Sequence, residues 1–390
     1  MTTKPIAKEK LFFPNLDGLR FLCFFAVFLF HCNGTILRKL NDGTTKQVLN
    51  FLFRNGELGV NAFFVLSGFL ITFLLIKEKK INNDISLKNF YIRRILRIWP
   101  LFYIVTFLGF IIFPIAKSAV HQTPHEIADY RYYLAFLPNF DFIHIKRFSF
   151  DVLPDASFLA VLWSVGIEEQ FYLAWPFTLK FSSSKKYPLI FLGIIFFTLI
   201  FRAFYLGNTS YDLAVRNFHT FSVIGDMAIG GMMAYFCSSD TKLLKYITTM
   251  PKWIIVLLYV TTAGVILFKQ HLFASGISLD VERLVLAILF AFIIAEQNYA
   301  QHSFFKFSKF KLMSKLGTYT YGLYCLHFIA VLAVIFVIEK YNLNISTLFP
   351  SVVVCAITLL LSIVISLLSY HLFEKYFLNL KNKFSFIVKK

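Results

Sequence analysis

The sequence predicts an all-α protein that crosses a membrane about ten times. Of its 390 residues, 58% are hydrophobic, and the mean hydropathy is +0.67, well above the values of soluble domains. Apolar stretches of about 20 residues, the length that a helix needs to cross the hydrocarbon core, recur along the whole chain. Lysine and arginine gather in alternate connections between these stretches, which is typical of multi-pass membrane proteins.

Ten stretches are long enough to span a membrane. They lie near residues 16–37, 57–77, 95–116, 156–180, 187–206, 217–237, 252–269, 281–298, 316–339 and 348–373. The first follows Lys4, Lys8 and Lys10, as the apolar part of a signal peptide would, but it contains Arg20 and has no small-x-small cleavage site. We therefore expect it to be retained as the first transmembrane helix.

The connections predict the orientation of the bundle. With the N-terminus in the cytoplasm, the basic segments all lie inside: 77–97, 180–186, 242–252, 306–315 and 375–390. The outside loops hold fewer cations, and in the long loop 117–155 acidic residues offset them. We expect both termini to be cytoplasmic and the chain to form a single membrane domain over 1–390, with a transmembrane core at about 11–376.

The net charge of +18 follows this orientation and suits contact with anionic lipid headgroups. A nucleic-acid-binding domain would instead collect its charge on one soluble face, so no nucleic-acid partner is expected. The cysteines show no CxxC spacing, and the sequence has neither a zinc or haem signature nor a glycine-rich phosphate loop. We expect no metal site.

Arg20 and His31 stand eleven residues apart in the first predicted helix. At about 100° per residue, this spacing places both side chains on one face, about 16 Å apart along the axis. Ionisable groups cost free energy in hydrocarbon and usually mark a pathway or a reaction centre.

The two residues have different alternative roles. Arg20 lies near the cytoplasmic end, where it alternatively snorkels to the headgroups or pairs with Asp17. His31 lies deep, in the outer half of the membrane, and imidazole suits acid–base or nucleophilic chemistry. The alternative for His31 is a hydrogen-bonded packing residue.

The next helices add further polar groups. Ser67 and the adjacent Gly68 would let a second backbone or a thin ligand approach closely, and helix packing is the simpler explanation. Arg94 and Arg97 share one face at the start of the third predicted helix, where two guanidinium groups suit phosphate oxygens. The alternative role for this pair is contact with lipid headgroups.

The later helices carry acids and a second histidine. Glu168 and Glu169 are adjacent carboxylates near the middle of the membrane, and at most one of them can face a given partner squarely. Either could pair with His31, position a hydroxyl or neutralise an arginine. Asp226 and His327 also lie within predicted helices, where hydrogen bonding to a neighbouring helix is the alternative to chemistry.

Taken together, these stretches resemble the acyltransferase-3 family of integral membrane acyltransferases. Arg20 and His31, in the segment that begins LDGLR, resemble the family's R-x10-H helix, and LGVNAFFVLSGFLIT is similar to its second-helix signature. FYIRRILRIWP resembles the basic helix start, LWSVGIEEQFYLAWP the WS-x-x-x-E-x-Q-F-Y motif, and LGTYTYGLYCLHF the C-terminal motif. The resemblance covers residues 11–376.

The resemblance implies a bacterial inner-membrane O-acyltransferase that moves an acyl group, by default acetyl, from cytoplasmic acyl-CoA to a hydroxyl of a cell-surface or lipid-linked carbohydrate. It implies a catalytic role for His31, with Glu168 lining the site, and donor binding by Arg20, Arg94 and Arg97. A pantetheine arm would pass Ser67 and Gly68 to reach His31. Glu169, Asp226 and His327 are further candidates for lining the site.

Two features depart from the family pattern. Asn61 stands where many relatives carry an acid, so no role is assigned to it. The SGNH-type esterase domain that some relatives append is not found here, so we expect the membrane domain or a separate partner to complete the transfer.

The outside loop is rich in aromatic and acidic residues. We expect it either to recognise the acceptor or to form an ordinary interfacial segment, through Tyr130, Tyr132, Tyr133, Phe136, Phe140 and Asp141.

The principal alternative is a transporter or flippase for a glycan or small anion. Buried histidine, glutamate and arginine also build proton relays. Such proteins often show internal repeats or helices broken at matching positions, and the sequence shows neither. The sequence leaves open the acceptor, the acyl chain length, the oligomeric state and the choice between an acyl-histidine intermediate and direct transfer.

Overall fold

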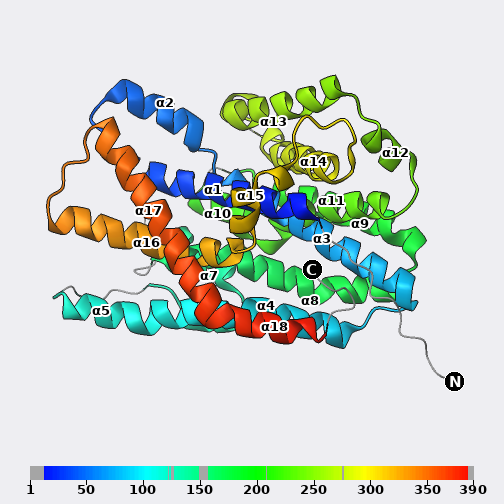
Figure 1. The fold of residues 1–390 in the computed structure, drawn as a ribbon, viewed down its shortest axis with the longest axis horizontal. Coiled ribbons are helices and arrows are strands. Elements are labelled where there is room, and N and C mark those ends of the chain that lie inside the picture. Colours follow the sequence, from blue (N-terminus) through cyan, green and yellow to red (C-terminus); the bar gives the residue numbers. More distant parts are fainter. Residues whose placement is uncertain are drawn as a thin grey trace.

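The computed structural model describes residues 13–121, 123, 127–148, 157–207, 209–274 and 276–384, and no strand occurs among them (Figure 1). Ten long helices form the bundle: α1 (Pro14–Gly34), α3 (Leu58–Asn82), α4 (Leu87–Phe107), α8 (Leu162–Phe181), α9 (Tyr187–Ala203), α11 (Thr220–Cys237), α13 (Lys252–Leu272), α14 (Ser278–Tyr299), α16 (Thr320–Lys340) and α17 (Leu348–Ser369). Each of the ten predicted stretches coincides with one of them. The all-α polytopic fold predicted from the sequence is confirmed.

Shorter helices join or extend the long ones. They are η1 (Leu37–Lys39), α2 (Gly43–Phe53), η2 (Leu108–Ile112), α5 (Phe113–Ala119), α6 (Tyr130–Leu134), α7 (Pro138–Phe148), η3 (Ser157–Val161), η4 (Ser184–Lys186), α10 (Ser210–Phe218), α12 (Lys242–Thr248), η5 (Phe307–Lys309), α15 (Lys311–Gly317), η6 (Tyr370–Glu374) and α18 (Lys375–Asn382). Two of these, η2 and η6, are π-helical turns that continue α4 and α17. In Figure 1, α13 and α14 form the upper edge of the bundle, and α4 and α5 form the lower edge.

Eight of the described helical stretches are long and apolar enough to cross a membrane by length and composition. The two long helices that fall short are α8 and α14. Each carries ionisable residues within its length, including Glu168 and Glu169 in α8 and Asp280 and Arg283 in α14. These charges lower their hydropathy, and the same charges make them the helices most relevant to a site.

Two predicted boundaries were wrong. Helix α4 begins at Leu87 rather than near residue 95, because the Ser86 hydroxyl accepts a hydrogen bond from the Asn89 backbone N–H at 3.4 Å and caps the helix. The basic pair of α4 therefore lies about two to three turns inside the helix and not at its start. The stretch 316–339 is also not one helix, because the chain turns at Thr318 between α15 and α16.

Contacts between connections define the two ends of the bundle. At one end, the Lys79 ammonium in the last turn of α3 donates to the carbonyl oxygens of Leu179 and Lys180 at the end of α8 and of Ser182 just after it, at 2.7–2.9 Å. At the other end, the Asn41 backbone N–H donates to the Ser346 carbonyl at 2.9 Å, which joins the exits of α1 and α16. We call these the basic end and the far end. They match the inside and outside of the predicted topology.

Small residues set the closest helix contacts. A Cβ added at Gly68 of α3 would clash with the backbone of Met227 in α11, and one added at Gly230 of α11 would clash with the Val65 carbonyl. Close backbone approach of this kind is the usual way in which helices associate inside a membrane. Helices α3 and α11 therefore pack with their backbones in contact, and both helices carry buried polar residues such as Ser67 and Asp226.

Candidate active site

The two histidines predicted separately lie in direct contact. His31 in α1 and His327 in α16 are joined by a hydrogen bond of 2.8 Å between Nδ1 of His31 and Nε2 of His327. Their rings stack with centroids 5.0 Å apart, and the Phe328 ring packs edge-to-face with His31 at 4.8 Å. His327 is fully buried, whereas His31 is half-buried. Packing brings together two side chains that stand 296 positions apart in the sequence.

The partners of His327 fix the protonation of both rings. Nδ1 of His327 lies 2.8 Å from the carbonyl oxygen of Tyr324 and 3.2 Å from that of Leu323. A carbonyl oxygen only accepts, so Nδ1 of His327 must carry the proton and Nε2 must accept. Nδ1 of His31 is then the donor in the histidine pair. The Nε2 of a neutral His31 keeps its lone pair and is available as a base or a nucleophile.

His31 lines a cavity of about 610 Å³ at the far end of the bundle, here called the outer cavity. Its wall is formed by Val27, Phe30, His31, Glu57, Leu58, Val60, Asn61, Phe142, Ala160, Val161, Trp163, Arg202, Arg216, Asn217, Phe218, Lys269, Leu279, Glu282, Arg283, Tyr324 and Phe328. The volume falls in the range of small-molecule sites. Asn61, to which the sequence assigned no role, belongs to this wall.

One side of the outer cavity is aromatic. Phe218 packs edge-to-face against Phe142 at 4.7 Å and against Trp163 at 4.9 Å, so three rings from α7, α8 and α10 form a continuous surface. Tyr324 adds a hydroxyl that shares a hydrogen bond of 2.7 Å with Ser164. A surface with flat apolar faces and nearby polar groups suits a ligand that is itself part apolar and part hydroxylated.

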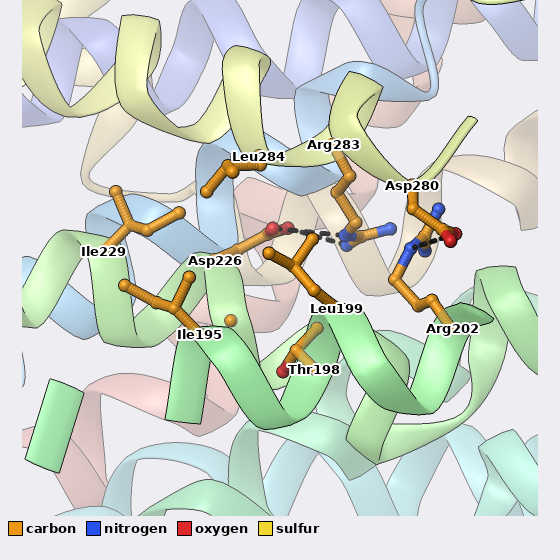
Figure 2. A pocket seen from close by; sticks show the side chains of 10 residues that line it. Ile195, Thr198, Leu199, Arg202, Asp226, Ile229, Asp280, Arg283 and Leu284 are labelled. Atoms are coloured by element: carbon orange, nitrogen blue, oxygen red, sulfur yellow. Dashed lines mark hydrogen bonds and ion pairs between the residues drawn. The ribbon is translucent and has the colours of Figure 1, made fainter. Parts of the chain in front are cut away.

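The opposite side of the outer cavity is charged. Lys269 pairs with Glu57 at 3.2 Å and with Glu282 at 3.1 Å. Figure 2 shows the adjoining cluster, in which Arg283 points to Asp226 and Arg202 points to Asp280, with ion pairs of 2.7 and 3.4 Å. Asp226 thus bonds to a neighbouring helix, the alternative that the sequence left open for it. Buried pairs of this kind lock α9, α11 and α14 together because removing one partner leaves an uncompensated charge.

Glu168 lies in a different network from the histidine pair. The Tyr172 hydroxyl donates to Glu168 at 3.0 Å and shares a hydrogen bond with Ser67. Among the described residues, Glu168 bonds to Tyr172 while His31 bonds to His327, so the structure does not pair this carboxylate with the imidazole. Ser67 is buried against Tyr172, and the Met227 backbone fills the side of α3 at Gly68, so Gly68 serves helix packing, the simpler explanation given for it. The pantetheine route past Ser67 stays a prediction.

Glu169 points to a third partner. It accepts a hydrogen bond of 2.8 Å from the indole N–H of Trp99 in α4. This confirms that the two adjacent carboxylates diverge around the helix, as their spacing predicts. Glu169 therefore ties α8 to α4.

The three arginines predicted for donor binding form one basic cluster between the α1, α4 and α8 helices. Arg97 lies within electrostatic range of Arg20 and Arg94, and of Glu168. Arg94 stands over the Tyr172 ring at 5.3 Å, and its buried Nε has no hydrogen-bond partner among the described residues. Arg20 pairs with Asp17 at 2.6 Å. The cluster lies toward the basic end and brings the Arg20 and Arg94/Arg97 predictions into one place.

The outside segment that was expected to contact the acceptor is largely packed into the bundle. Tyr133 is 1% exposed and Asp141 is 1% exposed, while Phe136 stacks on Phe102 at 4.3 Å. Phe136 thus packs the turn between α6 and α7 against α4, Tyr133 packs on Phe110 of η2, and Asp141 accepts a hydrogen bond from the Asp129 backbone N–H at 3.3 Å. These three side chains have structural contacts, whereas Tyr130 is exposed. The segment reaches the outer cavity through Phe142 instead.

Several cavity residues were missed by the sequence analysis. Three arginines of the cavity wall lie in or beside predicted spans: Arg202, Arg216 and Arg283. A charged residue at such a position usually has a function or a buried partner, so the sequence contained a signal for them. Glu374, in the π-helical turn η6, was missed as well, and it lies within electrostatic range of Arg97. Within the described parts of the chain, no group of three histidine, cysteine or acidic side chains is placed to hold a metal ion.

Comparison with known proteins shows the family of this chain. The sequence matches the acyltransferase-3 family, described as an acyltransferase domain, over residues 13–367. It is 29% identical to a peptidoglycan O-acetyltransferase of Listeria monocytogenes over 334 residues, which is 82% of this chain and 49% of that protein. It is 27% identical to a predicted O-acetyltransferase of Staphylococcus aureus over 385 residues, which is 94% of this chain and 57% of that protein.

The chain thus spans about half the length of these curated relatives. A predicted peptidoglycan O-acetyltransferase of Bacillus subtilis is 34% identical over 169 residues, 42% of this chain and 23% of that protein. No solved structure matches. Because the family match covers most of the sequence, the chain belongs to the acyltransferase-3 family of multi-pass membrane proteins.

Proposed function

We propose that this protein is an O-acyltransferase of the bacterial inner membrane that transfers an acetyl group from cytoplasmic acetyl-CoA to a hydroxyl of a carbohydrate at the far side. The observation that carries the proposal is the hydrogen bond of 2.8 Å between His31 and His327 at the wall of the outer cavity. The names of the relatives, which refer to O-acetyl transfer and to peptidoglycan, point to the same chemistry and acceptor class.

In this proposal His31 is the catalytic base. Its Nε2 takes the proton of the acceptor hydroxyl as the hydroxyl oxygen attacks the thioester carbonyl. The carbon–sulfur bond breaks, the thiolate of coenzyme A takes the proton back from His31, and the products are the acetyl ester and the free thiol. Transfer through an acetyl group held on His31 uses the same lone pair and is the alternative order of steps.

His327 acts as a positioning residue. Its Nδ1–H donates to the Tyr324 carbonyl, which leaves its Nε2 as the acceptor for the Nδ1–H of His31. This bond holds the His31 ring in one tautomer and orientation, and it stabilises the imidazolium that forms when His31 takes a proton. The arrangement resembles an acid–base pair in which the second group orients the first.

The basic cluster is the proposed donor site. Coenzyme A is a polyanion that reaches the protein from the cytoplasm, and Arg20, Arg94 and Arg97 collect positive charge toward the basic end of the bundle. Guanidinium groups bind phosphate oxygens through two parallel hydrogen bonds. The network of Ser67, Tyr172 and Glu168 adjoins this cluster and is the polar region that the thioester arm would meet first.

The outer cavity is the proposed acceptor site. Sugar rings pack their apolar faces on aromatic side chains and bond their hydroxyl groups to charged and amide groups, and the cavity supplies both. The aromatic surface of Phe142, Phe218 and Trp163 lies in the same cavity as His31. An acceptor from the far side would thus meet the base directly.

The test is a His31→Ala variant of the purified full chain, assayed for acceptor-dependent release of coenzyme A. We expect a loss of at least about 100-fold, because general base catalysis contributes about 10²–10⁴-fold. The matched control is His271→Ala, which removes an exposed histidine near the same end of the bundle. Acetyl-CoA binding by calorimetry is expected to be unchanged in both variants.

A fully active His31→Ala protein would end the proposal that His31 is the base. A protein that moves substrate across vesicles without releasing coenzyme A would favour the transporter alternative.

A further inference from the structure

Arg216, in α10, is the charged residue of the outer cavity wall that has no ion pair with another described residue. Its side chain is 5% exposed, and its Nη1 has no hydrogen-bond partner among the described residues. The other cations of the cavity wall are all ion-paired: Lys269 with Glu57 and Glu282, Arg202 with Asp280, and Arg283 with Asp226. A buried guanidinium without a partner costs free energy unless a ligand satisfies it.

The nearby carboxylate does not supply that partner. Asp280 interacts with Arg216 electrostatically, but it forms its ion pair with Arg202 at 3.4 Å. The four cations of the cavity wall and the four acids that pair with them balance overall, because Lys269 lies between two carboxylates. At Asp280, however, two guanidinium groups share one carboxylate, so positive charge is in local excess at Arg216. In a site of low dielectric, such a charge attracts an anion more strongly than it would in water.

Hydrogen bonds hold the backbone around Arg216 in place before any ligand binds. Arg202 donates to the Arg216 carbonyl at 2.8 Å, and the Ser222 hydroxyl donates to the Val215 carbonyl at 2.8 Å. At its other end, α10 begins with a capping box between Thr209 and Asp212. A binding group held in place before the ligand arrives loses little entropy when the ligand binds.

We propose that the outer cavity takes an acceptor that carries an anionic group, a carboxylate or a phosphate, and that Arg216 binds this group while His31 faces the hydroxyl to be acylated. The proposal rests on the proposed function and narrows its acceptor class. Arg216 and His31 line the same cavity, with the aromatic surface of Phe218 and Trp163 in the wall that they share. The guanidinium can bond two oxygen atoms of either anion at once.

The experiment measures binding and turnover with three matched acceptors. They are chitotetraose, which is neutral, and its carboxymethyl and 6-phosphate derivatives. The full chain in lipid nanodiscs is compared with Arg216→Gln, with Arg216→Lys and with the control Arg38→Gln, which removes an exposed arginine at the same end of the bundle. Thermal unfolding reports whether each variant is folded.

We expect the unmodified protein to bind at least one anionic derivative about 10- to 100-fold more tightly than chitotetraose, as one charge-assisted guanidinium contact provides. Arg216→Gln should remove this preference, because it weakens binding of the anionic derivatives far more than binding of chitotetraose. Arg216→Lys should keep part of the preference, and Arg38→Gln should keep all of it. The tighter of the two derivatives identifies the anion as a carboxylate or a phosphate.

Equal binding of all three acceptors by the unmodified protein would overturn the proposal. An equal loss of affinity for all three acceptors in Arg216→Gln would overturn it as well.

If Arg216→Gln does not fold, inorganic phosphate provides a second measurement on the unmodified protein, because it should compete with the anionic derivatives and not with chitotetraose. Charge-selective binding without coenzyme A release would contradict the proposed function alone, and transfer without charge preference would contradict the anion site alone.

Discussion

The histidine pair explains how a single side chain in α1 could become a base inside a membrane. His31 alone would be a titratable group with two equivalent tautomers. The bond from its Nδ1–H to His327, and the bond from His327 to the Tyr324 carbonyl, select one tautomer for both rings. The tautomer of His31 therefore depends on a side chain from a distant helix and on a backbone carbonyl.

Removing His327 should impair the reaction without removing the base. In His327→Ala, Nδ1 of His31 loses its acceptor and the ring loses its fixed orientation. We expect kcat to fall about 100-fold, the cost of a misplaced catalytic group, with little change in KM for acetyl-CoA. Steady-state kinetics of coenzyme A release measures both constants.

The variant His327→Gln separates positioning from packing. The Gln side-chain oxygen can accept the hydrogen bond of His31, so this variant should recover part of the rate that His327→Ala loses. Equal losses in the two variants, together with equal drops in thermal stability, would mean that His327 only fills space.

The basic cluster makes a separate prediction about the donor. Each guanidinium–phosphate contact contributes about 1.5–3 kcal/mol, so Arg94→Ala combined with Arg97→Ala should weaken acetyl-CoA binding at least about 100-fold. Isothermal calorimetry on the purified full chain measures this. Lys88→Ala is the control, since it removes an exposed positive charge from the same helix. Unchanged affinity in the double variant would leave these arginines as contacts to headgroups.

Among the helices, α3 and α11 form the contact that determines where the polar groups stand. Helix α3 carries Asn61 to the outer cavity and Ser67 to the Tyr172 network, and α11 carries Asp226 to its pair with Arg283. Glycine at position 230 lets the two backbones touch. A change in this contact would shift both networks together.

Adding one methyl group at that contact should be destabilising. Gly230→Ala places a Cβ against the Val65 carbonyl and the Phe69 backbone nitrogen, and overpacking of this kind costs about 1–3 kcal/mol. Thermal unfolding in detergent measures the loss. The control Gly193→Ala lies in α9, where an added Cβ meets nothing within 4 Å, so it should be neutral or slightly stabilising. Equal thermal stability of the two variants would show that α3 and α11 can move apart to accommodate the added Cβ.

The whole bundle has two chemically different ends. At the basic end, Lys79 in the last turn of α3 bonds to the last carbonyl groups of α8, and the outer cavity with its charged wall lies at the other end. This polarity agrees with a donor that arrives from the cytoplasm and an acceptor that arrives from outside. The proposed function therefore requires the orientation that the sequence predicts.

Reporter fusions test that orientation. With both termini cytoplasmic, β-galactosidase fused to the C-terminus should be active and alkaline phosphatase at the same place should be inactive. Phosphatase inserted between Asn41 and Gly43, after α1, should be active. The reverse pattern would invert the topology, and with it the assignment of the donor and acceptor ends.

Much of this protein could be read from the order of its residues. Hydropathy and alternating lysine-rich connections predicted ten helices, because a bilayer imposes the length and polarity of each span locally. The same reasoning singled out His31, Arg94, Arg97, Glu168 and His327, because each is an ionisable group in an apolar stretch. Recurrence of these motifs in order was enough to indicate the family.

The partners of those residues were decided only by the tertiary structure. His31 meets His327 and not Glu168, Glu168 turns to Tyr172, and Arg216 is left without the carboxylate that Arg202 takes. Each of these outcomes depends on how helices far apart in the chain rotate and pack against one another. Periodicity along one helix places a side chain on a face, but the helix that covers that face is chosen by close packing of the whole bundle.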